Sequence, residues 1–318
     1  MTGARMTAPA PSPPAPRPGA AVHVTLLFVQ LCFGTFHVVA KGLLAGMEPM
    51  AVVGLRVAIA TPLLALWAWR HDRTIPSRQD WAWLLLLGGL GVTANQILFI
   101  LGLQHTTANN ASILMTSLPV FAAAAGALLG IERVSGRRLL GIALAVGGAL
   151  VMVNPGRFSI AGTAGRTSFG NFLILGNALS YALFLVLQRP ILQRLPWRTV
   201  IAGSFVCGGP LVLAASLPAL VSTDLGEIPL AGWMGVLYIA LFATVFAYAA
   251  NTWAVRRSSP ALVAAYGMLQ PVVTAGLATV YLGETLGWVE GVGFALIVAG
   301  LWQVSAPAGG RDAKQRRG

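Results

Sequence analysis

Charge is scarce in this sequence, because only 9% of its 318 residues are Asp, Glu, Lys or Arg. In ordinary soluble domains such residues make up roughly a quarter of the chain. Hydrophobic residues account for 56%, and the mean hydropathy is +0.76. This composition excludes an ordinary water-soluble enzyme. Apolar stretches of about 20 residues recur, each long enough to cross a hydrocarbon core about 30 Å thick. The sequence therefore predicts an all-α integral membrane protein.

Cysteine, histidine and acidic residues are too few for common kinds of catalytic site. The chain has two cysteines, four histidines and nine acidic residues. Cys32 and Cys207 lie in apolar runs, which excludes a CxxC metal or redox motif. The histidines and acids form no metal cluster or acid–base motif, and there is no GxxxxGK[ST] loop for ATP. We therefore expect no cofactor, no metal and no catalytic residue, and an integral-membrane transferase is a remote alternative.

Hydropathy predicts ten membrane-spanning helices. Their approximate bounds are 22–42, 50–69, 81–103, 106–130, 136–153, 169–188, 199–220, 230–252, 260–282 and 287–305. Residues 1–21 are rich in Pro and Ala, and we expect them to form a disordered cytoplasmic leader. Residues 306–318 form a basic tail.

The basic residues predict the orientation, since short loops rich in Lys and Arg stay in the cytoplasm. With the N-terminus inside, 17 of the 21 basic residues fall in inside segments. Lys41, Arg157 and Arg166 fall outside, and Arg56 lies within a span. Both termini are therefore predicted to be cytoplasmic, in a multi-pass protein of the inner membrane. The net charge of +12 is explained by this topology and by contact with anionic membrane lipid, so we expect no nucleic-acid partner.

The chain contains an internal repeat. A shift of 152 residues superposes identical residues, namely Trp81 on Trp233, Pro119 on Pro271, Glu132 on Glu284, Gly141 on Gly293 and Gly148 on Gly300. A shift of 148 fits the start of each half better and superposes Phe36 on Phe184. Each half has five spans, so the two copies would cross the membrane in opposite senses. We expect a first repeat at 22–154, an external linker at 155–168 and a second repeat at 169–305.

Polar side chains recur on one face of several spans. Polar groups are unfavourable in hydrocarbon, so such faces usually point to the bundle interior or to a water-filled cavity. The stripes predict a central cavity between the two repeats. Its candidate substrate-binding residues are His37, Asn95, Gln96, Ser112, Thr116, Asn177, Tyr181, Tyr248, Asn251, Tyr266 and Gln270.

Five further residues are candidates for coupling or gating. Glu132 and Glu284 each close a span, where a carboxylate would cap the next helix, serve as a gate or bind a proton. Pro119 and Pro271 are expected to kink the interiors of their helices. Arg56 is a permanent charge deep in a span, and it would snorkel outward, bond helix carbonyls, attract a substrate carboxylate or pair with Glu284.

Several motifs carry a resemblance to a known family. They are FGTFHVVAK at 33–41, PMAVVGLRVAIATP at 49–62, the run 107–132 and, most specific, the run 258–300. In each half a Pro is followed 13 residues later by Glu. These features resemble the EamA-type branch of the drug/metabolite transporter superfamily, although Phe-Gly stands at 33–34 where the family often has Trp-Gly. The resemblance implies ten helices in two inverted repeats and a metabolite exporter or permease.

The predicted function is secondary transport of a small molecule, with amino acids or related amphipathic metabolites exported by alternating access. A drug or lipid-linked sugar permease of the same superfamily is the alternative. A proton is a candidate coupling ion, because histidine titrates near physiological pH and His37 lies within a span. Stripes of small residues such as Gly283, Gly287 and Gly291 suit packing within the bundle or a dimer interface, so both a monomer and a homodimer remain open.

Cysteine labelling tests the predicted topology. Cysteines introduced at Gly162 and Asp224 should react with an impermeant reagent from outside, and one at Arg137 should react from inside, because the basic residues fix the inner loops. The reverse labelling pattern would contradict the orientation.

Overall fold

The computed structural model describes residues 19–129, 136–153 and 163–305, and every regular element in these ranges is a helix. This confirms the all-α expectation for the described residues. Glu132, the tail 306–318, and most of the expected leader and linker lie outside the described residues.

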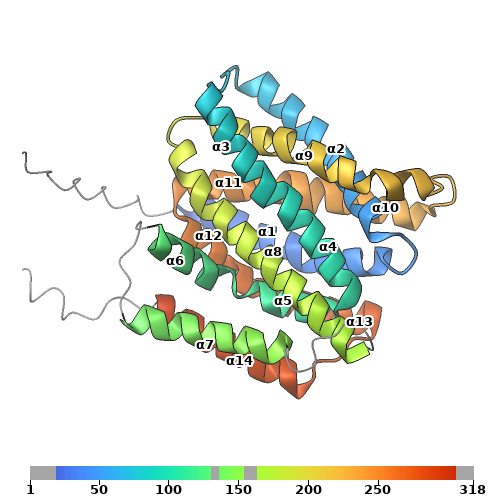
Figure 1. Ribbon diagram of the computed structural model, residues 1–318, viewed down its shortest axis with the longest axis vertical. Coiled ribbons are helices and arrows are strands. Elements are labelled where there is room, and N and C mark those ends of the chain that lie inside the picture. Colours follow the sequence, from blue (N-terminus) through green and yellow to red (C-terminus); the bar gives the residue numbers. More distant parts are fainter. Residues whose placement is uncertain (1–18, 130–135, 154–162, 306–318) are drawn as a thin grey trace, which may run out of the picture.

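The helices of the two halves follow one another in the same order (Figure 1). The first half contains α1 (Ala20–Leu43), α2 (Pro49–His71), α3 (Arg78–Gly88), the π-helix η1 (Gly89–Ala94), α4 (Asn95–His105), α5 (Ala108–Met115), α6 (Leu118–Leu128) and α7 (Gly136–Val153). The second half contains α8 (Thr163–Ile191), α9 (Trp197–Ser222), α10 (Leu230–Ala240), the π-helix η3 (Leu241–Phe246), α11 (Ala247–Arg257), α12 (Pro260–Tyr266), the 3-10 turn η4 (Gly267–Leu269), α13 (Gln270–Leu282) and α14 (Trp288–Ser305).

Seven helical segments are long and apolar enough to cross a membrane. They are 20–43, 49–71, 78–105, 165–191, 197–222, 230–257 and 260–282. Large apolar side chains such as Trp69, Leu230 and Val280 are more than 70% exposed on the outer faces of these helices. Such exposure is expected where lipid is the solvent. The protein is therefore a multi-pass membrane protein. The spans expected at 106–130, 136–153 and 287–305 coincide with the shorter helices α5 with α6, α7 and α14.

The sequence repeat is also a repeat of local structure. The elements α3, η1 and α4 begin at residues 78, 89 and 95, and α10, η3 and α11 begin 152 residues later. The same shift relates α7 to α14, and a shift of 148 relates the start of α2 to the start of α9. Both π-helices therefore occupy matching positions of the two halves.

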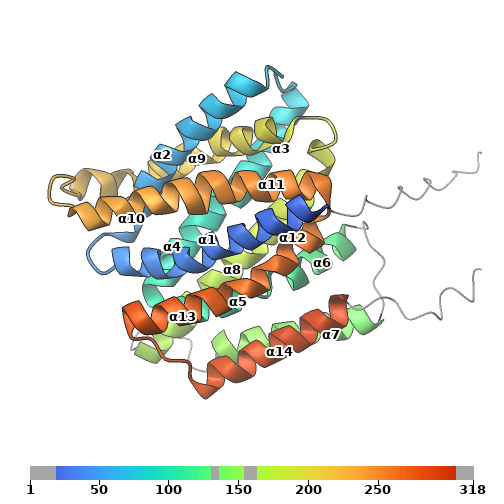
Figure 2. The same cartoon turned by 180° about the vertical axis from the view of Figure 1, so that it is seen from behind.

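The helices α7 and α14 lie side by side at one edge of the bundle in both views (Figures 1 and 2). Glycines let their backbones approach closely. A Cβ atom added to Gly148 would lie 2.7 Å from Gly293 O, and one added to Gly300 would lie 2.5 Å from Gly141 O. The shift of 152 turns one contact into the other. Each half therefore supplies one glycine that lies against a backbone oxygen of the other half.

The remaining helices form layers across the bundle. The helices α1 and α8 cross its middle, α2, α3 and α9 cover one side, and α13 with α5 separates the middle from α7 and α14 (Figures 1 and 2). The helix α1 packs along α13, and its counterpart α8 packs along α6. Each of these two central helices therefore packs against a helix of the other half.

The two expected proline kinks are wrong in position. Pro119 is the second residue of α6, and Pro271 is the second residue of α13. The preceding backbone breaks at Thr116–Ser117 and at η4, so each proline begins a new helix instead of bending the interior of one. The reason is that the first turn of a helix does not need the N–H that proline lacks.

Two adjacent glycines of α7 offer a matched test of the α7–α14 contact. Gly148→Ala places a methyl group against Gly293 O, whereas Gly147→Ala meets no atom within 4 Å. We expect the first change to lower the free energy of unfolding by about 1–3 kcal/mol through overpacking, and the second to leave it unchanged or slightly higher. Thermal unfolding in detergent measures both. Equal stability of the two variants would contradict the close packing.

Candidate functional site

The polar face of α1 positions the site against α13. Gly34 permits close contact, because a Cβ there would lie 2.6 Å from Val273 Cβ. Thr274 Oγ1 donates a hydrogen bond to Gly34 O over 3.0 Å, and Gln270 Nε2 donates to Gln30 Oε1 over 2.9 Å. These bonds join the first half to the second within the apolar part of the bundle.

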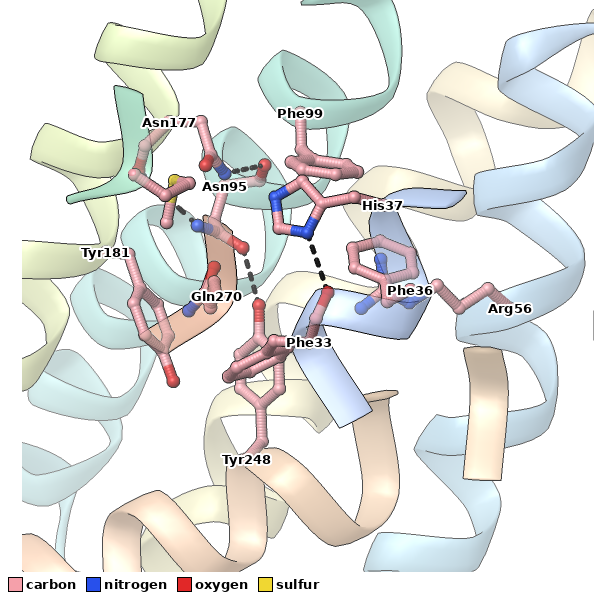
Figure 3. A pocket seen from close by; sticks show the side chains of 11 residues that line it. Phe33, Phe36, His37, Arg56, Asn95, Phe99, Asn177, Tyr181, Tyr248 and Gln270 are labelled. Carbon is pink, nitrogen blue, oxygen red and sulfur yellow. Dashed lines mark hydrogen bonds between the residues drawn. The ribbon is translucent and has the colours of Figure 1, made fainter. Parts of the chain in front are cut away.

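A cavity lies at the centre of the bundle (Figure 3). Its walls come from α1, α2, α4 and α5 of the first half and from α8, α11 and α13 of the second. The lining residues are Phe33, Phe36, His37, Arg56, Asn95, Phe99, Met115, Asn177, Tyr181, Tyr248 and Gln270. The free space is about 40 Å³, which is room for about three water molecules.

Asn95 and Asn177 bridge the two halves at one wall of the cavity. Asn177 Nδ2 donates to Asn95 O over 2.7 Å, and Asn95 Nδ2 donates to Asn177 O over 3.4 Å. The hydroxyl of Tyr248 donates to Asn95 Oδ1 over 2.5 Å. The three residues come from α4, α8 and α11, so one hydrogen-bonded group fixes three helices.

Aromatic rings form the apolar walls. Tyr181 and Tyr248 pack edge to face with centroids 5.4 Å apart, and Phe36 stacks on Phe99 at 4.6 Å. Asn251, which does not line the cavity, donates through Nδ2 to the Tyr181 hydroxyl over 2.8 Å and so fixes the position of that ring. The cavity therefore presents flat apolar surfaces between a few fixed polar groups, as small-molecule sites do.

His37 has one ring nitrogen bonded and one free. Nδ1 lies 2.6 Å from Phe33 O, and a carbonyl oxygen only accepts, so Nδ1 carries a hydrogen (Figure 3). Nε2 is buried and has no hydrogen-bond partner among the described residues. In the neutral ring Nε2 is an acceptor. His37 thus offers a vacant acceptor at the cavity.

Arg56 binds the π-helix of the opposite half. Its Nε donates to Thr244 Oγ1, and its Nη2 donates to Ala243 O over 3.2 Å. The guanidinium carbon lies 4.4 Å from the centre of the Phe36 ring. The wide turn of a π-helix frees backbone carbonyls from regular pairing. Of the alternatives for Arg56, the structure therefore shows bonding to a helix carbonyl. Within the described ranges it shows no pairing with Glu284.

Glu284 binds the start of α5 instead. Its two carboxylate oxygens accept from Ala108 N over 2.8 Å and from Asn109 N over 2.9 Å. Gly283 has φ +65°, a left-handed conformation that ends α13 and turns the chain toward α5. The expectation that Glu284 caps the helix following it in sequence is therefore wrong, because packing brings the N-terminus of α5 closer.

Lys41 forms hydrogen bonds close to those of Glu284, where α4 ends and α5 begins. Its Nζ donates to Leu103 O over 2.8 Å and to Thr106 O over 2.6 Å, at the end of α4. Together with the Glu284 bonds, these contacts tie α1, α4, α5 and α13 to one another. We call Lys41 and Glu284 with these backbone partners the end clasp.

Five of the expected cavity residues do not line the cavity. They are Gln96, Ser112, Thr116, Asn251 and Tyr266. The hydroxyls of Ser112 and Thr116 turn back to carbonyls of their own helix. The Tyr266 hydroxyl lies 2.5 Å from His23 Nδ1, toward the other end of α1. Gln96 is fully buried on a different side of α4 from Asn95, since consecutive helical residues point about 100° apart.

Four lining residues were not expected: Phe33, Phe36, Phe99 and Met115. Because their side chains are apolar, the polar stripes do not include them. The available signal was position, since Phe33 and Phe36 precede His37 by four residues and by one. Within the described ranges, no three His, Cys, Asp or Glu side chains lie together as a metal site would require.

Comparison with known proteins decides the family. The model of the EamA-like transporter family matches residues 21–154 and again 168–306. The chain belongs to this family. The resemblance to EamA-type transporters inferred from the motifs is therefore confirmed.

Individual relatives agree with this assignment. An uncharacterized transporter of Archaeoglobus fulgidus is 27% identical over 89% of this chain and 97% of its own length. A probable terminal-alkyne amino-acid exporter of Streptantibioticus cattleyicolor is 29% identical over 84% of this chain and 88% of its own. A protein of known crystal structure superposes with a TM-score of 0.62 at 16% identity, over 90% of this chain and 97% of that chain, and so shares the fold.

Glu284→Gln tests the end clasp of this family member. A glutamine keeps one carbonyl oxygen for two N–H donors and removes the anion from the N-terminus of α5. We expect the free energy of unfolding to fall by about 1–3 kcal/mol. Thermal unfolding in detergent measures the change, with Glu227→Gln at an exposed loop position as control. Equal unfolding temperatures for the two variants would contradict the clasp.

Proposed function

We propose that this protein is a secondary transporter that exports small amphipathic metabolites, such as amino acids, across the bacterial inner membrane by alternating access. The observation that carries the proposal is the buried cavity between the two halves. Its aromatic walls suit the apolar part of such a metabolite, and its polar groups suit the head group. The similarity to a probable amino-acid exporter supports the substrate class.

The proposed architecture has ten spans, with both termini in the cytoplasm. To the seven long segments it adds α5 with α6, α7 and α14. At 1.5 Å per residue, the 18 residues of α7 or α14 extend about 27 Å, close to the thickness of the hydrocarbon core. Five spans in each half give repeats of opposite orientation. The reciprocal glycine contacts between α7 and α14 support this symmetry.

Alternating access is supported by the state of the cavity. Residues of both halves line it, so a movement of one half against the other would change its access. In the proposed topology the end clasp lies on the external side. Release of the Lys41 and Glu284 bonds would open the cavity outward, and the pseudo-symmetric motion would open it inward.

His37 is the proposed site of proton coupling. Its free Nε2 lies at the cavity, where a proton would reach it from whichever side is open. A bound proton drives transport only if it favours one open state over the other. Because His37 contacts Phe33 O on its own helix and Phe99 on α4, its charge would bear on how α1 and α4 pack.

Flux into proteoliposomes tests both proposals. Purified protein should move amino acids of the panel, and an imposed pH gradient should change the rate. His37→Gln keeps hydrogen bonding but does not titrate in this range, so flux should persist and its pH dependence should disappear.

His71→Gln is the matched control, because His71 Nδ1 bonds the carbonyl of Trp67 in the same i−4 pattern but at an exposed position. An unchanged pH profile in the His37 variant would remove this residue from the mechanism. Flux of drugs or lipid-linked sugars, without flux of amino acids, would replace the proposed substrate class.

A further inference from the structure

A surface cleft of about 650 Å³ lies where α2 ends and the chain turns toward α3 (Figure 1). Its lining residues are Trp69, Arg70, Asp72, Arg73, Thr74 and Ile75. Ligand pockets in proteins commonly have volumes of about 300–1,000 Å³. The cleft is therefore large enough for a polar head group, and it shares no lining residue with the central cavity.

Two arginines of the cleft are free to bind an anion. Arg70 and Arg73 are exposed, and neither guanidinium has an ion pair or hydrogen bond within the part of the chain that the structure describes. The acidic residue of the cleft is already paired, because Arg198 Nη1 lies 3.3 Å from Asp72 Oδ1. The cleft thus carries two positive charges that its own carboxylate does not neutralise.

Apolar surface leads from the membrane core to these arginines. Leu63, Leu66 and Arg70 recur at i, i+3 and i+7, so they share one face of α2. Both leucines are exposed on this membrane-spanning segment, as side chains in contact with lipid are. Trp69 is 72% exposed and Ile75 is 89% exposed. Tryptophan is enriched at the level of lipid head groups, which indicates that the cleft lies at the membrane surface.

The second half of the chain holds the loop of the cleft in place. Asp72 pairs with Arg198, and Arg194 Nη2 lies 3.1 Å from Asp80 Oδ1 in the first turn of α3. Asp80 also forms a capping box with Ser77, at the end of the same loop. The cleft therefore has a shape fixed by both halves. A ligand bound there would stabilise a contact between α2 and α3 of the first half and the α8–α9 connection of the second.

We propose that this cleft binds one anionic phospholipid. Arg70 and Arg73 bind the phosphate oxygens, for which a guanidinium offers paired N–H donors. Trp69 packs against the glycerol region, and an acyl chain follows Leu66 and Leu63 into the hydrocarbon. In the proposed topology the cleft faces the cytoplasmic leaflet, whose anionic lipids attract basic segments. The site lies outside the central cavity and does not depend on which substrate is transported.

The unfolding temperature of the full-length protein in an uncharged detergent tests the site. The protein is titrated with dioleoyl phosphatidylglycerol, with dioleoyl phosphatidylcholine or with inorganic phosphate. A ligand that binds the folded state raises the unfolding temperature. We expect a saturating rise with phosphatidylglycerol. The choline lipid has the same chains but adds a positive group beside the arginines, and phosphate lacks the apolar part, so both should give a much smaller rise.

Variants locate the site. Arg70→Gln combined with Arg73→Gln should raise the apparent dissociation constant for phosphatidylglycerol about 10- to 30-fold. The lysine pair at these positions should raise it less, because lysine keeps the charge without the planar fork. Arg256→Gln combined with Arg257→Gln is the charge-matched control, since both arginines are exposed at the end of α11. The control should leave the dissociation constant within about threefold of the wild type.

Three results would overturn the proposal. An equal rise with both lipids would show general lipid contact only, and an equal rise with inorganic phosphate would show a site for free anions. Equal weakening in the two arginine pairs would show an effect of net charge without a site at the cleft. If the glutamine pair at 70 and 73 does not fold, the lysine pair and Trp69→Ser decide, and unchanged binding in both would also reject the site.

Discussion

Buried polar groups in this bundle must find their partners inside the protein, because lipid offers none. The structure meets this requirement across the two halves. Arg56 of α2 bonds to η3, Asn95 of α4 bonds to Asn177 of α8, and Glu284 bonds to the start of α5. Each of these bonds joins residues of opposite repeats. Several of the polar groups around the cavity are therefore also groups that bond one half of the chain to the other.

Each of the two π-helices forms a hydrogen bond to the other half of the chain. They begin 152 residues apart, and each gives a backbone carbonyl to the other half. In η1 the Leu90 oxygen accepts from Ser180 Oγ over 2.6 Å, and in η3 the Ala243 oxygen accepts from Arg56. Single π-turns inside α-helices occur frequently at functional sites. The π-helix thus occurs at matching positions of both halves, but the side chain that bonds to it is Ser180 in one case and Arg56 in the other.

That difference makes the cavity chemically asymmetric. The shift of 148 that relates α2 to α9 places Ser204 at the position equivalent to Arg56. Ser204 bonds to Val200 O within its own helix over 2.8 Å. The shift of 152 places Gln96, which does not line the cavity, at the position equivalent to Tyr248, which does. The two halves thus place different side chains at equivalent positions, and only one member of each pair lines the cavity.

The sequence by itself determined the membrane class, the repeat and the family, because hydropathy, offset and motif spacing are properties of the linear chain. It also indicated six of the eleven cavity residues as cavity-lining, and it singled out Arg56 for coupling or gating, since a polar side chain within a membrane span has few places to point. Only the tertiary structure decided that Phe36 and Phe99 complete the walls, that Ser112 and Thr116 turn away, and that the prolines start helices. Only it joined Arg56 to Thr244, 188 residues apart. The physical reason is that helical periodicity fixes which residues share a face, whereas the rotation and contact of each helix are set by packing against its neighbours.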